Sequence, residues 1–316
     1  CAHRPKIPRI CSLPTVSRAY DLCMSRSLTH TLVGLWIACI LALWPWQLCS
    51  AQTTKPTSRA VVYRFSPVNQ YGIARTAAYW NPIIAYVSEK SGVPIELKIG
   101  RTSADTTAYV IAREVEFIFS NHLFSPQREK LGWRLFARRN VAPVHGEIIV
   151  PNESTITELA QLAGHAVAFP GPEALIAYKF PYAQLLSRGI GIQVVFGGNM
   201  DAALLQMFSG KVSAAGANSQ LAESFARREQ RTYRVLWRSE PLHDLPLMAA
   251  AKVPEKIVAA VANAFIQMAQ DPIGQPILRT ASDRIGLPAD TAFITSTPNE
   301  YAAYRRFYQT APLALR

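Results

Sequence analysis

Residues 196–218 constrain the fold of this chain more than any other stretch. An apolar run ends at Phe196, the pair Gly197–Gly198 follows, and a helical pattern then extends to Phe208. Gly210 ends that pattern, and a run of small residues up to Asn218 has the character of a buried strand. The stretch predicts a βαβ crossover, whose glycine turn lies at the carboxyl edge of a parallel sheet, where ligands bind.

Asp201 lies in the first turn of this predicted helix, beside its unpaired backbone N–H groups. Its carboxylate has two interpretations. It either stabilises the positive end of the helix dipole or lines a ligand cleft. The stretch by itself leaves both interpretations open.

Strands and helices alternate through most of the chain, so we expect an α/β protein. Helical periodicity is clearest around Trp80 and Val261, and a capping box at Thr155–Glu158 predicts a further helix start. The predicted strands are residues 60–65, 93–99, 115–119, 133–138, 146–150, 167–169, 192–196, 212–217, 233–237 and 247–251.

Composition indicates a globular chain with room for two lobes, since 49% of its 316 residues are hydrophobic and 17% are charged. The net charge of +12 favours small acidic ligands or an anionic membrane face. The arginine pairs 138–139, 227–228 and 305–306 are far apart in sequence, so we expect no nucleic-acid partner.

The first 51 residues have the pattern of an export signal. Met24 and Arg26 precede an apolar run over residues 32–46, and Cys49–Ala51 fits a small-x-small cleavage site. We therefore predict an upstream segment (1–23), a signal peptide (24–51) and a periplasmic location, with an uncleaved membrane anchor as the alternative. All five cysteines precede residue 50, so the rest of the chain has no disulfide framework.

Several catalytic and cofactor motifs are absent from the sequence. It has no HExxH pair, no GxSxG nucleophile elbow and no phosphate-binding P-loop. Gly189–Gly191 lacks the third glycine of a dinucleotide fingerprint. We expect no cofactor, no metal site and no enzymatic activity.

Three stretches resemble the phosphate-, phosphite- and phosphonate-binding proteins of ABC transporters. They are Gly198–Leu205 continuing through residues 209–213, Ile156–Phe169, and Arg101–Leu123. The resemblance implies a type II periplasmic-binding fold, in which two lobes are joined by two crossing strands and hold the ligand between them. The crossings are expected near residues 142–147 and 239–247. Lobe one is then residues 58–143 plus 242–316, and lobe two is residues 144–241.

The resemblance also implies a function. The chain is expected to be a monomeric, extracytoplasmic solute-binding protein that passes a small polar or anionic ligand to the permease of a phosphonate- or phosphate-like ABC transporter. Whether the ligand is the family's or an altered one stays open. One alternative is a sensory or scaffolding receptor of the same fold, signalling to a membrane partner such as a sensor kinase. A second alternative is an exported α/β enzyme.

Strand ends and the resemblance together predict ten ligand-binding residues. They are Ser66, Ser103, Ser120, Asn121, His122, His145, Glu173, Ala174, Asp201 and Asn218. Each also has a structural interpretation, as a helix cap, a turn residue, a helix-start residue or a hydrogen-bonded structural histidine.

This chain departs from the family pattern at the expected site. Where the family has Ser-Thr-Ser at a helix N-terminus, this sequence has Ala174, Leu175 and Ile176. The tyrosines that commonly contact ligand correspond to Ser103 and Ser120, and the histidine before the acid is Met200. Asp201 is retained.

Overall fold

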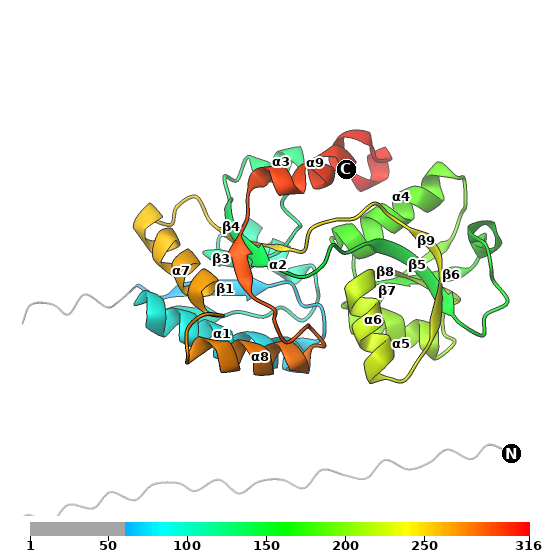
Figure 1. Cartoon of the computed structure of the whole chain (residues 1–316). Coiled ribbons are helices and arrows are strands. Elements are labelled where there is room, and N and C mark those ends of the chain that lie inside the picture. Colours follow the sequence, from blue (N-terminus) through cyan, green and yellow to red (C-terminus); the bar gives the residue numbers. More distant parts are fainter. Residues whose placement is uncertain (1–60) are drawn as a thin grey trace, which may run out of the picture. The chain divides into compact units, whose positions relative to one another are not determined.

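The structure is a computed structural model that describes residues 61–316. The predicted upstream segment and signal peptide lie outside the described residues. Two β-sheets with helices packed against them form the described part of the chain (Figure 1). The predicted two-lobe α/β fold is confirmed. Within residues 61–316, no helix combines the length and the apolar character that a membrane span requires.

The first lobe is built on a six-stranded mixed sheet. Its order is β11 (Phe293–Thr295), β4 (Arg134–Arg139), β10 (Pro246–Ala249), β3 (Phe117–Phe119), β1 (Tyr63–Pro67) and β2 (Ile95–Leu97). Strands β1, β2 and β3 are parallel, and β10 runs antiparallel to both β3 and β4. The loops that follow β1 and β3 therefore lie at the same edge of the sheet.

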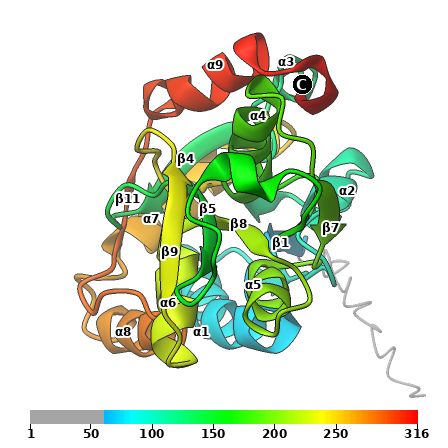
Figure 2. The same cartoon turned by 90° about the vertical axis from the view of Figure 1, so that its right-hand side faces the viewer.

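The second lobe is built on a five-stranded sheet. Its order is β7 (Gln193–Phe196), β6 (Ala166–Phe169), β8 (Ala214–Asn218), β5 (Gly146–Pro151) and β9 (Tyr233–Arg238). The predicted crossover is present as β7, α5 and β8, and it passes over β6, which lies between these two strands. Helix α4 covers one face of this sheet, and α5 and α6 cover the other (Figure 2).

The first lobe has six α-helices and two 3₁₀ turns among the described residues, and α1 packs against α7 and α8. They are α1 (Ile73–Ser91), α2 (Asp105–Ile111), α3 (Pro126–Glu129), α7 (Glu255–Gln267), α8 (Gly274–Arg284) and α9 (Ala302–Thr310), with 3₁₀ turns η3 (Pro298–Tyr301) and η4 (Leu313–Leu315). Those of the second lobe are the 3₁₀ turn η1 (Leu159–Leu162), the π-helical turn η2 (Leu175–Lys179), α4 (Phe180–Ser187), α5 (Met200–Phe208) and α6 (Ser219–Arg228).

Trp80 lies at the centre of the first lobe's core, as the helical pattern predicts. Its ring packs 4.8 Å from that of Phe65 and 5.1 Å from that of Phe119, and only 3% of its surface is exposed. Truncating such a buried aromatic side chain costs about 3–5 kcal/mol of stability. The core thus fixes β1 and β3, whose carboxyl ends carry residues of the site.

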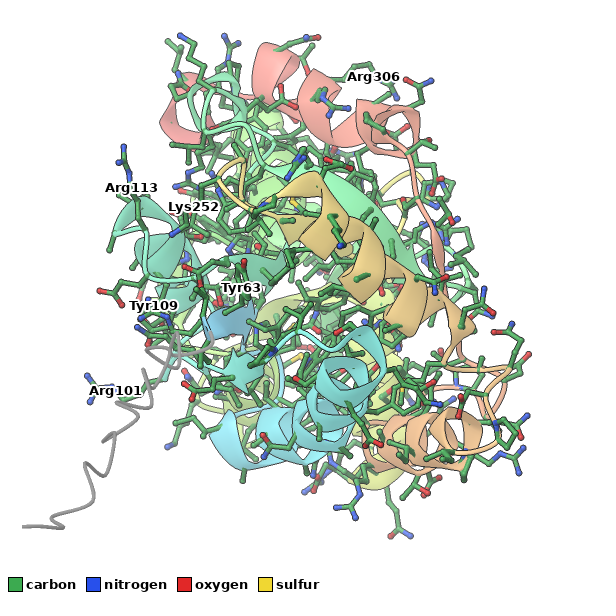
Figure 3. All side chains as sticks on the ribbon, turned by 90° about the vertical axis from the view of Figure 1, so that its left-hand side faces the viewer. Tyr63, Arg101, Tyr109, Arg113, Lys252 and Arg306 are labelled. Carbon is green, nitrogen blue, oxygen red and sulfur yellow. The ribbon has the colours of Figure 1, made fainter. Side chains whose placement is uncertain are left out.

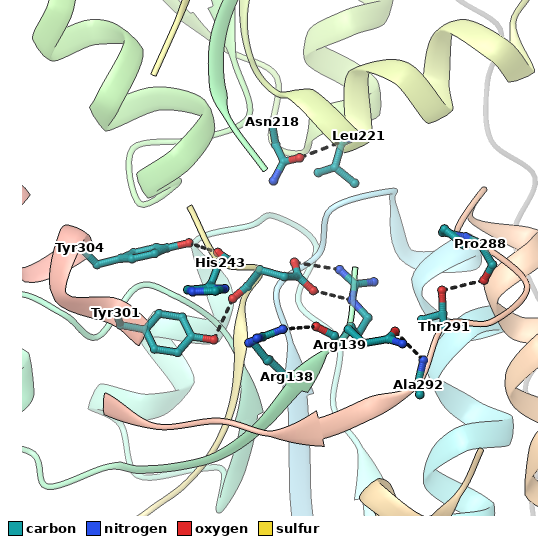
Figure 4. A network of polar contacts seen from close by, with 12 residues as sticks. Arg138, Arg139, Asn218, Leu221, His243, Pro288, Thr291, Ala292, Tyr301 and Tyr304 are labelled. Atoms are coloured by element: carbon teal, nitrogen blue, oxygen red, sulfur yellow. Dashed lines mark hydrogen bonds and ion pairs between the residues drawn. The ribbon is translucent and has the colours of Figure 1, made fainter. Parts of the chain in front are cut away.

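Two crossing segments join the sheets, as the fold predicts. They pair at Val144 and Leu242, whose N–H groups each donate a 2.8 Å hydrogen bond to the other's carbonyl oxygen. Near these segments in sequence, the buried pair Arg139–Asp244 is joined by Nε–Oδ2 and Nη2–Oδ1 distances of 2.6 and 3.1 Å (Figure 4). Tyr301 donates to the carbonyl oxygen of Asp244 at 2.9 Å, so the C-terminal segment anchors the second crossing.

Two local features differ from the sequence prediction. The capping box is Glu158 with Gln161, which opens only the short 3₁₀ turn η1, so the prediction of a helix start at Thr155–Glu158 was wrong. Strand β11 was not predicted, because its three residues are too few to show an alternation pattern.

Candidate functional site

A small cavity lies between the lobes, where the carboxyl ends of β1 and β3 face the second sheet. Its volume is about 40 Å³, counted as space open to the centre of a water molecule. Its polar lining residues are Asn69, Gln70, Ser103, Asn121, His122 and Asn218. Its apolar lining residues are Val68, Pro170, Ala174, Leu175, Ile176, Ala177, Met200, Leu221 and Leu245.

Five of the ten predicted ligand-binding residues line this cavity. They are Ser103, Asn121, His122, Ala174 and Asn218. In the first lobe, Ser103 precedes α2, and Asn121 and His122 follow β3. In the second lobe, Ala174 and Asn218 are the N-cap residues of η2 and α6. The predicted cluster therefore divides into a cavity wall and a set of residues outside it.

The helical turn η2 forms the second lobe's apolar wall. The backbone N–H groups of Leu175, Ile176 and Ala177 donate no hydrogen bond to any other residue that the structure describes, as is normal for the first turn of a helix. The turn approaches β8 closely at Gly216, where a Cβ would lie 2.5 Å from the carbonyl oxygen of Ala177. The wall thus offers backbone donors without side-chain hydroxyls.

His122 is the one titratable side chain among the described residues of the cavity wall. Its Nδ1 lies 3.0 Å from Oγ1 of Thr107, and its backbone N–H donates to Oγ of Ser120 at 3.1 Å. Burial lowers its pKa to about 4; the carboxylate of Glu173 partly opposes this shift. The imidazole is therefore neutral at pH 7. Its Nε2 has no hydrogen-bond partner within residues 61–316.

Asn218 caps α6 and leaves its amide nitrogen available. Its Oδ1 accepts a hydrogen bond from the backbone N–H of Gln220 at 3.0 Å. It accepts a second from the backbone N–H of Leu221 at 3.3 Å (Figure 4). With the oxygen occupied, Nδ2 is the part of the side chain that can donate to a ligand.

The lobes touch directly on either side of the cavity. The backbone N–H of Ser103 donates to the carbonyl oxygen of Gly198 at 2.7 Å, and that of Met200 donates to the carbonyl oxygen of Gln70 at 3.0 Å. The contacts join two loops of the first lobe to the turn before α5 and to the first residue of α5. The structure is accordingly a closed form.

Glu173 lies next to the cavity wall but forms an ion pair across the lobes. Nη2 of Arg128 donates to Oε1 of Glu173 at 2.9 Å, and Nη1 donates to Oε2. Burial favours a higher pKa for Glu173, but the hydrogen bonds and charge of Arg128 outweigh it and lower the pKa. The carboxylate is therefore already paired.

Asp201 forms a second ionic link between the lobes. Its Oδ2 lies 3.2 Å from Nη1 of Arg75 in α1 and 2.7 Å from Nη2 of Arg228 in α6. Burial raises the pKa of Asp201, and the charges of Arg228 and Arg75 offset part of this rise. The carboxylate lines a groove on the outside of the cleft and not the central cavity.

The remaining three predicted residues have local partners. Ser66 Oγ lies 3.1 Å from Oγ1 of Thr106, and Ser120 Oγ accepts from the backbone of His122. Nδ1 of His145 lies 2.9 Å from the carbonyl oxygen of Ser239, at the crossing segments. None of the three lines the cavity.

Sequence reasoning missed several wall residues, including Asn69, Gln70 and Met200. Asn69 and Gln70 lie in the loop after β1, so the same strand-end signal that selected Ser66 pointed to them. Asn69 is held in place by donating to the carbonyl oxygens of Gly100 at 2.9 Å and Arg101 at 3.1 Å. Met200 carried no polar signal and enters the wall through the position of α5.

Other kinds of site have little support in the described part of the chain. Residues 61–316 contain no group of three or more His, Cys, Asp and Glu side chains placed to hold a metal ion. Basic side chains are dispersed over the first lobe: Arg101, Arg113 and Lys252 project near β1 and α2, whereas Arg306 lies on α9 (Figure 3).

The sequence over residues 65–292 matches the family model of the periplasmic phosphonate-binding proteins of ABC transporters. This match covers both crossing segments and every residue that lines the cavity. Among curated proteins, none matches the sequence.

Several solved structures have the same fold at low sequence identity. The methylphosphonate complex of PhnD1 from Prochlorococcus marinus is 14% identical, with a TM-score of 0.68 over 81% of this chain and 99% of that chain. A binding protein of an ABC phosphonate transporter from Pseudomonas aeruginosa is 13% identical, with a TM-score of 0.67 over 78% and 86%. The aliphatic sulphonate-binding protein SsuA from Escherichia coli is 16% identical, with a TM-score of 0.51 over 78% and 92%.

Proposed function

Since the chain belongs to the periplasmic phosphonate-binding proteins of ABC transporters, we propose that it binds a small phosphonate-like oxyanion between its lobes. It then presents this ligand to an ABC permease. Ligand binding and lobe closure are coupled in this proposal, because only the closed form brings both cavity walls together. The chain acts by binding and carries out no reaction.

The observation that carries the proposal is the cavity wall formed by η2 and Asn218. Three backbone N–H groups at Leu175–Ala177 have no other partner within residues 61–316, and the turn continues directly into α4. Such groups at the start of a helical segment favour anions. The amide nitrogen of Asn218 adds a donor from the second lobe. Nε2 of His122 adds one from the first lobe in the tautomer in which Nδ1 accepts the hydrogen bond from Oγ1 of Thr107.

The absence of side-chain hydroxyls at Ala174–Ile176 is expected to weaken oxyanion binding relative to a protein with Ser-Thr-Ser at this turn. A hydrogen bond to a charged group is worth roughly 1.5–3 kcal/mol, so the loss of three such donors costs several kcal/mol. We propose that this chain binds its oxyanion more weakly than a relative with Ser-Thr-Ser at the same turn, or that it prefers a different oxyanion.

The rest of the proposal concerns location, partner and limits of the lobes. We propose that the N-terminal segment directs export to the periplasm, and that the chain works as a monomer with an inner-membrane permease. We also propose residues 58–143 plus 242–316 as lobe one and residues 144–241 as lobe two, which agrees with the division of strands between the sheets.

Thermal unfolding of the full chain with a ligand panel tests the proposal. The panel is phosphate, phosphite, alkylphosphonates, sulfonates, carboxylates and amines. A ligand at about 100 times its Kd adds roughly 2.7 kcal/mol of stability, which raises Tm by a few degrees for a chain of this size. A shift with phosphonate or phosphite is expected. Shifts confined to carboxylates or amines, or no shift at all, would overturn the proposal.

A further inference from the structure

The described residues that line the cavity include no lysine, arginine, aspartate or glutamate. Its only titratable side chain is His122, which is buried and neutral at pH 7. Every other polar group in the wall is an amide, a hydroxyl or a backbone group. The cavity therefore offers no carboxylate to a positively charged group on a ligand.

Two carboxylates that adjoin wall residues in the sequence are each paired with arginines. Glu173 precedes the wall residue Ala174 but is bound by Arg128 from the opposite lobe through two hydrogen bonds. Asp201 follows the wall residue Met200 but pairs with Arg75 and with Arg228. Both acids hold the lobes together instead of facing the cavity.

We infer that the ligand of this site carries no positively charged group, and that a substituent on its oxyanion centre is small and apolar. This inference deepens the proposed function and rests on it. The apolar lining available to such a substituent includes the side chains of Leu175, Met200 and Leu245. An ammonium group enclosed there loses its hydration and gains no counter-charge. A methyl group of the same size loses nothing and buries apolar surface.

The selectivity against an ammonium group depends on Arg128, because this arginine occupies the carboxylate of Glu173. If Arg128 is removed, the carboxylate of Glu173, next to the wall residue Ala174, loses its hydrogen-bonded partner and keeps only the nearby charge of Lys179. The variant then offers a counter-charge to a ligand ammonium, which the native chain withholds.

A matched pair of ligands tests the inference by titration calorimetry on the full chain. Ethylphosphonate and aminomethylphosphonate have the same number of non-hydrogen atoms, and differ in a methyl group against an ammonium group. They are compared at a pH where both phosphonate groups carry the same charge and the amine is protonated. The native chain should bind ethylphosphonate at least about tenfold more tightly, since an unpaired buried charge is costly. Methylphosphonate and phosphite complete the size series.

Two arginine variants give the second arm of the experiment. Arg128→Gln should shift the affinity ratio towards aminomethylphosphonate by about fivefold or more. Arg134→Gln, which removes an arginine paired with Glu255 elsewhere in the first lobe, should leave the ratio unchanged.

The outcomes separate this inference from the proposed function. If the native chain binds aminomethylphosphonate and ethylphosphonate with equal affinity, the inference is wrong, whereas the proposed phosphonate binding stands. If the chain binds neither of these nor phosphite, methylphosphonate or phosphate, the proposed function fails and the inference fails with it. An Arg128→Gln variant that does not fold leaves the comparison of ligands on the native chain decisive.

Discussion

Arg128 and Glu173 belong to different lobes and are joined by two hydrogen bonds across the mouth of the cavity, one of them 2.9 Å long. Nη1 of Arg128 also donates to the carbonyl oxygen of His122 at 2.8 Å, so the same guanidinium contacts the cavity wall. About a fifth of each side chain in the pair is exposed. The pair therefore stabilises the closed form more than a fully exposed ion pair would.

Glu173→Gln is expected to destabilise the closed form. The substitution leaves Arg128 without a counter-charge in a half-buried site, at a cost of about 1–3 kcal/mol. The affinity for a bound phosphonate should fall by about tenfold, and small-angle X-ray scattering of the ligand-free chain should show a larger radius of gyration. Glu255→Gln, at an exposed pair with Arg134, serves as the control and should change neither quantity. An unchanged radius and affinity in Glu173→Gln would contradict this role.

Stability is expected to fall as the pH drops below about 6.5, through His122. Burial lowers the pKa of His122 to about 4 in the folded chain, whereas the unfolded chain binds the proton near the ordinary value of about 6.5. The full stability is therefore present above the unfolded-state pKa and is lost as the pH falls towards the folded-state pKa. At pH 5 the loss is about 2 kcal/mol.

Urea unfolding at pH 7 and pH 5 measures this effect. The native chain should lose about 2 kcal/mol more between the two pH values than His122→Gln, which lacks the titrating group. The carboxylates titrate in both proteins, so the difference isolates the imidazole. Equal losses in the two proteins would show that His122 is not held neutral by burial.

Gly171→Ala is expected to weaken ligand binding with little effect on stability. A Cβ at Gly171 would lie 2.6 Å from Oγ of Ser103 in the opposite lobe, so the lobes could not close fully unless that serine moved. We expect phosphonate affinity to fall by about fivefold or more, with Tm of the ligand-free chain nearly unchanged. Gly191→Ala is the matched control, because a Cβ there meets no atom within 4 Å. Equal affinities in the two variants would refute the closure argument.

Asn218→Asp is expected to weaken anion binding while keeping the helix cap. Aspartate caps a helix as well as asparagine does, so α6 should keep its stability. The new negative charge would face the cavity in place of the Nδ2 donor and should lower oxyanion affinity by at least about tenfold. The control is Asn199→Asp, which caps α5 through the N–H of Ala202 at 2.9 Å and lies outside the cavity wall. Retained affinity in Asn218→Asp would remove this residue from the site.

The order of strands and helices could be predicted because it depends on local signals. Gly197–Gly198 marks a turn, and the periodicity around Trp80 marks a buried helix face, whatever the rest of the chain does. Such signals also placed Ser103, Asn121 and Asn218 at strand or helix ends, where they line the cavity. Strand β11 and the π-helical turn η2 left no comparable pattern, since each is short and is fixed by its neighbours.

The sequence by itself determined the alternation of strands and helices, the cysteine-free composition of residues 50–316, and the absence of hydroxyls at Ala174–Ile176. Only the tertiary structure decided which polar residues face the cavity. Glu173 and Asp201 carry the same charge in any fold, but whether they are free to bind a ligand depends on Arg128, Arg75 and Arg228. These arginines are 45, 126 and 27 residues away in sequence, and only chain folding and lobe closure bring them to the acids.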